Sequence, residues 1–285
     1  ALYAGAGGGG GIQDAKIMYE LALEEGNENL QGIAILLRVY LFSVLTDVYG
    51  DIPYTEALKA NEGINSPKYD SQEEIYNNLL SLLDDANNLL DTNGGTITST
   101  SDIVYGGNYL KWKKFANSLK FRLLMRISNR ADFNRQAELQ DIIDNRVMFT
   151  SNADEAKLVY LASAPNNNPV NQSIIGGNRA EFKVNSVLVD MLTSTNDPRL
   201  PVFAQLNSDG IYRGKPSGII NVPSTEWDYP NVSAIGTAYL SPTAPAFLLS
   251  YAEQELLIAE AAKRGLIAGG DSEAETHYNN GVLAS

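Results

Sequence analysis

The stretch WKKFANSLKFRLLMRIS, residues 112–128, carries the strongest structural signal in the sequence. Its apolar residues recur three and four positions apart, which is the spacing of one face of an α-helix. That face contains Trp112, Phe115, Ala116, Leu119, Leu123 and Ile127. We therefore predict a helix over residues 109–128, with Trp112, Phe115 and Leu119 buried in the core.

Helical patterns continue on both sides of this stretch. Residues 29–49 carry a long apolar stripe that stops at Gly50, where a left-handed residue is favoured, and Pro53 follows shortly after. The next helix begins at Ser71 and Glu74, whose spacing is that of a capping box. We expect it to end at Gly94 and Gly95. Further helices are predicted at residues 134–146, 186–193, 247–264 and 273–285.

The helical period disappears over residues 149–179 and 207–245, where Asn, Ser, Pro and Gly are frequent. Loops of this length in a compact domain are commonly functional. Consecutive helix pairs suggest units that stack because one pair cannot bury its own apolar stripe. We predict a mainly α fold: a tetratricopeptide-like helix-turn-helix scaffold with a long irregular loop-rich face, although the consensus residues of that repeat are poorly matched.

We assign residues 1–285 to a single domain. Its predicted segments are an unassigned Gly/Ala-rich start at 1–11, a helical scaffold at 12–146, a loop-rich candidate ligand face at 147–245 and C-terminal scaffold helices at 246–285. This organisation places the longest irregular segment between two helical ones.

Composition narrows the class of protein. The chain has 21 Lys and Arg against 34 Asp and Glu, a formal net charge of −13, which argues against nucleic acid or an anionic membrane surface as partner. It contains no cysteine, so disulfides, thiolate metal sites and cysteine nucleophiles are excluded. No uninterrupted run of about 18 apolar residues is present, so we predict no membrane-spanning helix.

No group of residues indicates catalysis. His277 is the only histidine, and we interpret it as a surface residue. The pairs Asp84–Asp85 and Glu24–Glu25 are adjacent on helices, where neighbours point about 100° apart, so we interpret each pair as a solvated face. There is no G-x-S-x-G nucleophile motif. We predict no catalytic residues, no metal ligands, no cofactor and no enzymatic activity.

Aromatic residues in the loops are the most informative functional signal. Sugars present apolar C–H faces and many hydroxyls, and their sites combine aromatic rings with polar side chains. Trp227, Tyr229 and Tyr212 are therefore candidate stacking residues of a ligand site. Asp228 and Arg213 are candidate hydrogen-bonding residues of the same site. The alternative, that these aromatic residues anchor their loops to the helices, stays open.

Four blocks, in order along most of the chain, resemble the SusD/RagB family. They are residues 37–57, with the sequence GDIPYTEA at 50–57; residues 69–76; residues 112–128; and residues 197–200 followed by 249–253 and 259–265. The resemblance runs from about residue 12 to the end of the chain. Most of the matching residues read as scaffold, so the ligand-site residues above depend on loop chemistry alone.

The resemblance implies a tetratricopeptide-like scaffold with a loop-built face, and a protein on the extracellular face of a Gram-negative outer membrane. A lipid on an N-terminal cysteine, absent from this chain, would anchor it there. The family sequences continue beyond Ser285, so we interpret the chain as truncated at both ends.

The resemblance also implies that the protein captures oligosaccharide and delivers it to a SusC-type TonB-dependent β-barrel transporter. A peptide ligand, as in RagB-like members, is the alternative. A glycoside-cleaving enzyme and a cytosolic tetratricopeptide scaffold are less favoured.

Overall fold

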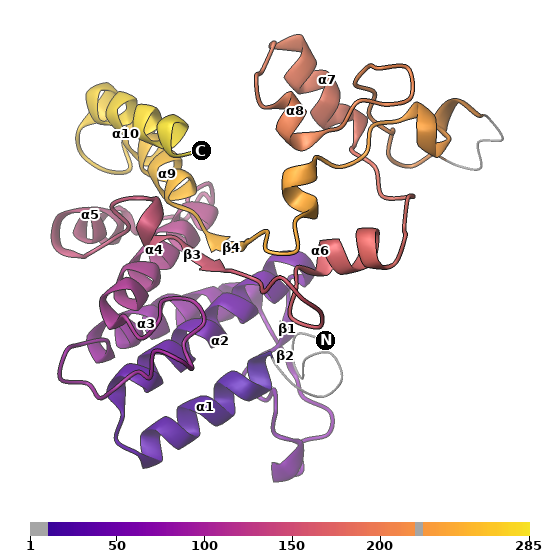
Figure 1. Ribbon diagram of the computed structural model, residues 1–285. Helices are drawn as coiled ribbons and strands as arrows, with labels where there is room; N and C mark the ends of the chain where they lie inside the picture. The colour runs from indigo at the N-terminus through magenta and orange to yellow at the C-terminus, as the bar shows by residue number, and fades with distance from the viewer. Residues whose placement is uncertain (1–10, 220–224) are drawn as a thin grey trace. The chain divides into compact units, whose positions relative to one another are not determined.

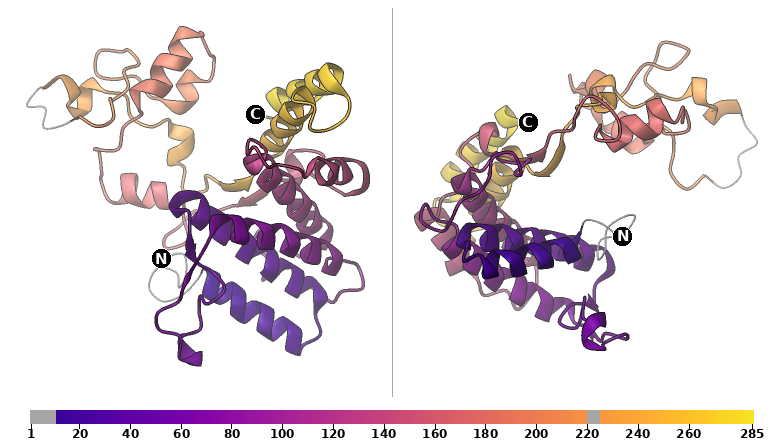
Figure 2. Two further views of the ribbon diagram at one scale, coloured as in Figure 1. Left: turned by 180° about the vertical axis from the view of Figure 1, so that it is seen from behind. Right: turned by 60° about the horizontal axis from the view of Figure 1, so that its bottom comes forward.

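The computed structural model describes residues 11–219 and 225–285 (Figures 1 and 2). The chain forms two compact units: the first runs up to Lys157 and resumes at Phe247, and the second is Leu158–Ala246. The chain leaves the first unit through β3 (Ala156–Leu158) and returns through β4 (Ala246–Leu249), and these strands pair with each other. The predicted mainly α class is confirmed.

Helices make up most of the first unit. They are α1 (Ile12–Glu24), α2 (Glu28–Tyr49), α3 (Gln72–Leu89), α4 (Tyr109–Ile127), α5 (Gln136–Asn145), α9 (Tyr251–Lys263) and α10 (Gly270–Ala284). Successive helices pack on one another: α1 on α2, α2 on α3, α3 on α4, and α9 on α10 (Figure 1). This stacking of helix pairs is the predicted tetratricopeptide-like scaffold.

Helix α4 lies at the centre of the first unit. Trp112, Phe115 and Leu119 are buried as predicted, with exposed fractions of 3%, 0% and 0%. The predicted stripe describes only part of the helix, because α4 contacts α2, α3, α5 and α9 and is buried on every side from residue 115 to 125. Even the side chain of Lys120 is enclosed there.

Lys120 is enclosed together with its counter-charges. Its ammonium group lies 2.7 Å from both carboxylate oxygens of Asp84 and 3.2 Å from Glu138. Arg146 adds a second cation 2.6 Å from Asp84. The interpretation of Asp84 as solvated holds only in part: its side chain is 39% exposed, but its carboxylate pairs with Lys120 and Arg146. Its neighbour Asp85 is exposed as expected.

Helix α2 is a candidate membrane span among the described residues, which the prediction of no membrane-spanning helix did not single out. By length and composition alone it could cross a membrane, because Arg38 is the only charged residue between Asn29 and Thr46. In the structure, α2 packs against α1, α3 and α4, and twelve of its residues are buried. Burial inside the helical scaffold is sufficient to explain its apolar composition.

The predicted helix ends are confirmed in part. Gly50 ends α2 with a φ of 72°, and Ser71 and Glu74 form the capping box of α3. The end of α3 is corrected: it stops at Leu89, because the fully buried Leu90 turns the chain into an extended conformation.

The glycines beyond α3 serve packing instead. A Cβ atom on Gly95 would lie 2.5 Å from the side-chain oxygen of Asn27, the N-cap of α2. Two further findings concern helix starts. Residues 12–28 were assigned to the helical scaffold without a helix range, and the structure forms α1 there. Helix α9 begins at Tyr251 rather than at residue 247, because β4 occupies the preceding residues.

The GDIPYTEA block forms a loop that Asp70 fastens to the start of α3. Strand β1 (Ile52–Pro53) pairs antiparallel with β2 (Tyr69–Asp70). The Asp70 carboxylate accepts hydrogen bonds from the backbone amides of Tyr54 (3.1 Å) and Thr55 (2.7 Å). Burial raises the pKa of Asp70, but these hydrogen bonds, with those from the Thr55 hydroxyl and Lys68, outweigh it and lower the pKa. The block is therefore scaffold.

His277 is partly buried, which corrects its interpretation as a surface residue. Its Nδ1 lies 2.7 Å from the buried carboxylate of Glu255 on α9, and its Nε2 lies 3.1 Å from Glu273. The hydrogen bond to Glu255 is the main cause that raises the pKa of His277. The histidine thus helps to hold α10 against α9.

The second unit consists of short elements around its own small core. They are α6 (Pro169–Asn171), a π-helical turn (Gln172–Gly176), α7 (Ser186–Ser194), α8 (Leu200–Phe203) and three 3-10 turns (Thr225–Trp227, Tyr229–Asn231 and Thr237–Leu240). Val184, Val189, Leu192, Leu200 and Ala204 form the core. All but the last residue of this unit falls within the loop-rich segment predicted at 147–245.

Candidate ligand site

Three segments of the second unit, residues 183–185, 213–215 and 233–235, are joined by backbone hydrogen bonds. The amide of Lys215 donates to the carbonyl of Val184 at 2.8 Å. The amide of Val184 donates to the carbonyl of Ser233 at 3.2 Å, and the amide of Ser233 donates to the carbonyl of Arg213 at 2.7 Å. The framework fixes the backbone from which the loop side chains project.

Gly214 allows the first two segments to approach closely. A Cβ atom at this position would lie 2.3 Å from the Cα atom of Ser186, too close for any side chain. The flanking residues, Arg213 and Lys215, are two positions apart, and in extended chain such residues project to the same side. The close approach at Gly214 therefore fixes the backbone between two cationic residues, Arg213 and Lys215.

Arg213, Lys215 and a third cation, Lys183, each lie over an aromatic ring. The guanidinium carbon of Arg213 is 4.7 Å from the ring centroid of Trp227. The ammonium groups of Lys183 and Lys215 are 5.5 and 5.9 Å from the ring centroid of Tyr229. These distances are within the range of cation–π attraction. We call these five residues the aromatic–cation cluster.

The structure brings together three of the five predicted site residues, Arg213, Trp227 and Tyr229. Arg213 also forms an ion pair with Glu226. Tyr212 packs against the core of the second unit, which is the anchoring role left open above. Asp228 is exposed, and its side chain makes no capping hydrogen bond to the 3-10 turn that follows it.

Sequence reasoning missed Lys183 and Lys215. The available signal was the pattern Arg213-Gly214-Lys215, which places two cations around a glycine. Lys183 carries no local signal, because it reaches Tyr229 only through the folded framework.

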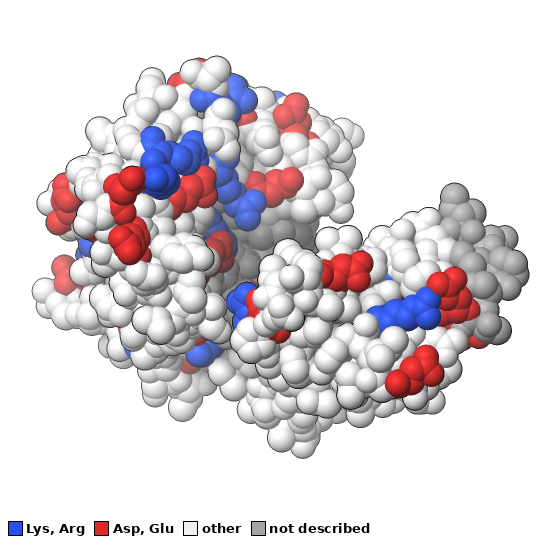
Figure 3. Space-filling view, turned by 90° about the horizontal axis from the view of Figure 1, so that it is seen from above, with Lys and Arg blue, Asp and Glu red and all other residues white. Residues whose placement is uncertain are grey.

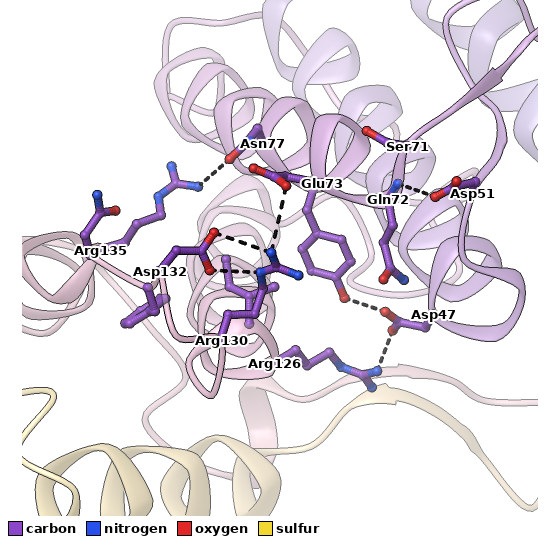
Figure 4. Close-up of a pocket in the computed structure, with 14 residues that line it drawn as sticks. Asp47, Asp51, Ser71, Gln72, Glu73, Asn77, Arg126, Arg130, Asp132 and Arg135 are labelled. Atoms are coloured by element: carbon purple, nitrogen blue, oxygen red, sulfur yellow. Dashed lines mark hydrogen bonds and ion pairs between the residues drawn. The ribbon is translucent and has the colours of Figure 1, made fainter.

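A second site, a cleft of about 940 Å³, lies in the first unit (Figure 4). It is lined mostly by polar and charged side chains from α2, α3, α4 and the adjoining loops, together with the apolar Ile127 and Phe133. Arg126 forms an ion pair with Asp47, and the hydroxyl of Tyr76 donates to the same carboxylate. Burial, followed by this hydrogen bond, raises the pKa of Tyr76.

The remaining cations of the cleft are also paired. Arg130 lies 3.1 Å from Asp132 and 3.9 Å from Glu73, and Arg135 donates to the side chain of Asn77 (Figure 4). The hydrogen bond from Arg130 lowers the pKa of Asp132, whereas a general acid needs a raised pKa. The Arg130–Asp132 pair therefore offers no favoured proton donor. The polar side chains of the cleft are suited to hydrogen bonding.

This cleft could not be predicted from local sequence patterns, because its residues come from separate elements and each resembles an ordinary residue of a helix surface. Charge elsewhere is dispersed: on the face shown in Figure 3, basic and acidic side chains form small adjacent groups rather than one continuous field. Over residues 11–219 and 225–285, no group of three or more His, Asp or Glu is placed to hold a metal ion.

Stacked helix pairs, with a separate loop-built unit between α5 and α9, define a helical-repeat scaffold protein. The sequence model of the SusD-like family, described as starch-binding and associating with the outer membrane, matches residues 9–285. The chain belongs to this family, which confirms the resemblance of the four sequence blocks. No curated protein matches the chain by sequence.

Solved structures agree with this assignment. A chitin-binding protein is 29% identical with a TM-score of 0.80, over 96% of this chain and 60% of its own. A SusD homologue from Bacteroides fragilis is 28% identical with a TM-score of 0.80, over 96% and 61%. A chitin-binding SusD homologue from Flavobacterium johnsoniae shares the fold at 24% identity, with a TM-score of 0.78 over 95% and 56%. The chain thus covers 56–61% of the length of these structures.

Proposed function

We propose that this chain is part of a cell-surface protein that captures oligosaccharide and delivers it to a SusC-type TonB-dependent transporter. The proposal includes a lipid anchor that holds the protein on the extracellular face of the outer membrane. The family match over residues 9–285 is the observation that carries it. Similarity to a chitin-binding protein at 29% identity supports a glycan as the ligand.

The aromatic–cation cluster supports the second unit as the place where the ligand binds. Apolar faces of sugar rings pack on aromatic side chains, and sugar hydroxyls exchange hydrogen bonds with charged groups. Tyr229 is 46% exposed and available for such contact, whereas Tyr76 in the cleft of the first unit is only 5% exposed. The cleft also satisfies its own charges. We therefore assign the ligand to the cluster.

Replacing Trp227 by Ala should weaken oligosaccharide binding roughly tenfold or more, because an aromatic platform contributes about 1–3 kcal/mol through buried contact area. The melting temperature should stay the same, since the ring lies outside both apolar cores. Calorimetric titration with a panel of oligosaccharides, combined with thermal melts, measures both quantities. We also expect each oligosaccharide to be recovered at its original length, as binding without cleavage requires.

A matched control is Tyr239→Ala, which removes another loop aromatic of the same unit, one that stacks on Phe203 at 5.6 Å. This variant should bind like the parent protein. Unchanged affinity of Trp227→Ala would remove Trp227 from the site. A lower melting temperature together with weaker binding would assign it the anchoring role instead.

A further inference from the structure

Within the part of the chain that the structure describes, Lys183 and Lys215 differ from most Lys and Arg residues because they form no ion pair with an acidic side chain. Fifteen of the 21 Lys and Arg side chains form ion pairs within the described residues. Lys183 and Lys215 form none there, in a chain with 34 Asp and Glu. The nearest acidic residues in sequence do not supply one: Glu181 pairs with Arg179, and Glu226 pairs with Arg213.

The two lysines are nevertheless held near each other. Both are partly buried, and both ammonium groups lie within 6 Å of the centre of the Tyr229 ring. Burial, and then repulsion from Lys215, lowers the pKa of Lys183. Two like charges beside one ring repel each other, and an anion bound near both would offset that repulsion. A backbone hydrogen bond from Lys215 to Val184 joins the two segments that carry these lysines.

We infer that Lys183, Lys215 and Tyr229 form a subsite for the anionic group of an acidic oligosaccharide, either a uronate carboxylate or a sulfate ester. The inference rests on the proposed function and specifies the ligand class of the same cluster. Lysine ammonium groups bind such anions as point charges with several donors, while Tyr229 and Trp227 contact the sugar rings. A neutral glycan would contact the rings but would leave the two positive charges uncompensated.

Titration with matched oligosaccharides tests the inference. The carboxylate probe is a set of oligogalacturonates, and the sulfate probe is a set of sulfated galactan oligosaccharides. Their neutral counterparts are the carboxyl-reduced and desulfated forms of the same chains. We expect at least one acidic probe to bind more tightly than its neutral form, and this preference to diminish as sodium chloride is added. The probe with the larger preference identifies the anionic group.

Lys183→Met and Lys215→Met remove one charge each and keep an apolar side chain of similar length. Each should weaken binding of the preferred acidic probe roughly tenfold, the usual scale for a hydrogen bond to a charged group, and leave its neutral form unaffected. The control is Lys59→Met in the first unit, which removes another partly buried lysine that forms no ion pair with any described residue. It makes the same change in net charge and should leave binding unchanged.

The titrations separate an incorrect acidic subsite from an incorrect proposed function. Neutral probes that bind as tightly as the acidic ones, or lysine variants that bind like the parent, would overturn the acidic subsite and leave the proposed function standing. A chain that binds no oligosaccharide of either kind would overturn the proposed function and the subsite together.

Discussion

Replacing Trp112 by Ala should lower the free energy of unfolding by about 3–5 kcal/mol, the usual cost of removing a large buried aromatic side chain. The indole ring is 3% exposed and meets Tyr105 edge to face at 5.1 Å. Its N–H donates to Asp102 at 2.8 Å. The substitution would thus leave a cavity in the core and remove a hydrogen bond from the carboxylate that organises the preceding loop.

Urea denaturation followed by far-ultraviolet circular dichroism measures this change, because most of the helix lies in the first unit. The control is Leu110→Ala on the same helix, where the side chain is 42% exposed and a change within about 0.5 kcal/mol is expected. A loss below about 1 kcal/mol for Trp112→Ala would contradict the position of α4 at the centre of the core.

Replacing Asp84 by Ala should cost about 2–3 kcal/mol. Removing one partner of a fully buried ion pair typically costs about 3–5 kcal/mol, and we expect less here because Asp84 keeps 39% exposure of its side chain. The loss of stability arises because the ammonium group of Lys120 is enclosed in the core. Without Asp84 it would keep only Glu138 as a counter-charge. Asp85→Ala removes the neighbouring exposed carboxylate and should change stability by less than about 0.5 kcal/mol.

The substitution Asp84→Ala should also alter the pH dependence of stability. Burial raises the pKa of Asp84, but hydrogen bonds from Lys120 and Arg146 outweigh it, so the folded-state pKa lies below the ordinary value of 3.8. This carboxylate therefore contributes stability above pH 3.8, which is lost as the pH falls through the folded-state pKa. Unfolding curves between pH 5 and pH 2.5 should fall less steeply for Asp84→Ala than for Asp85→Ala. Parallel curves would show that Lys120 does not depend on Asp84.

The sequence predicted the helices whose apolar period is strong and whose ends carry local signals. Helix α3 is the best case, because Ser71 and Glu74 cap it through contacts within one turn. Helix α1 was given no range because its buried residues include the small Ala15 and Ala22, which make a weak apolar stripe. The start of α9 was misplaced because Phe247, which belongs to β4, continues the apolar pattern backwards.

The candidate site was less predictable because its contacts are tertiary. Trp227 and Tyr229 were predicted from residue type, and their neighbours Arg213 and Lys215 come from a segment that only the folded framework brings close. Tyr212 has the same chemistry as Tyr229 in the sequence, yet it packs on the core of the second unit. Residue type alone could not separate a binding role from an anchoring one.

The proposed function makes this chain part of a binding protein that works together with a barrel transporter. The most direct test is to purify the full-length protein from outer membranes, in mild detergent and at native expression. We expect a much larger β-barrel protein to co-purify with it, because the proposed function requires the captured oligosaccharide to pass from one to the other. Repeated recovery of the protein alone, under conditions that preserve other outer-membrane complexes, would contradict the proposed function.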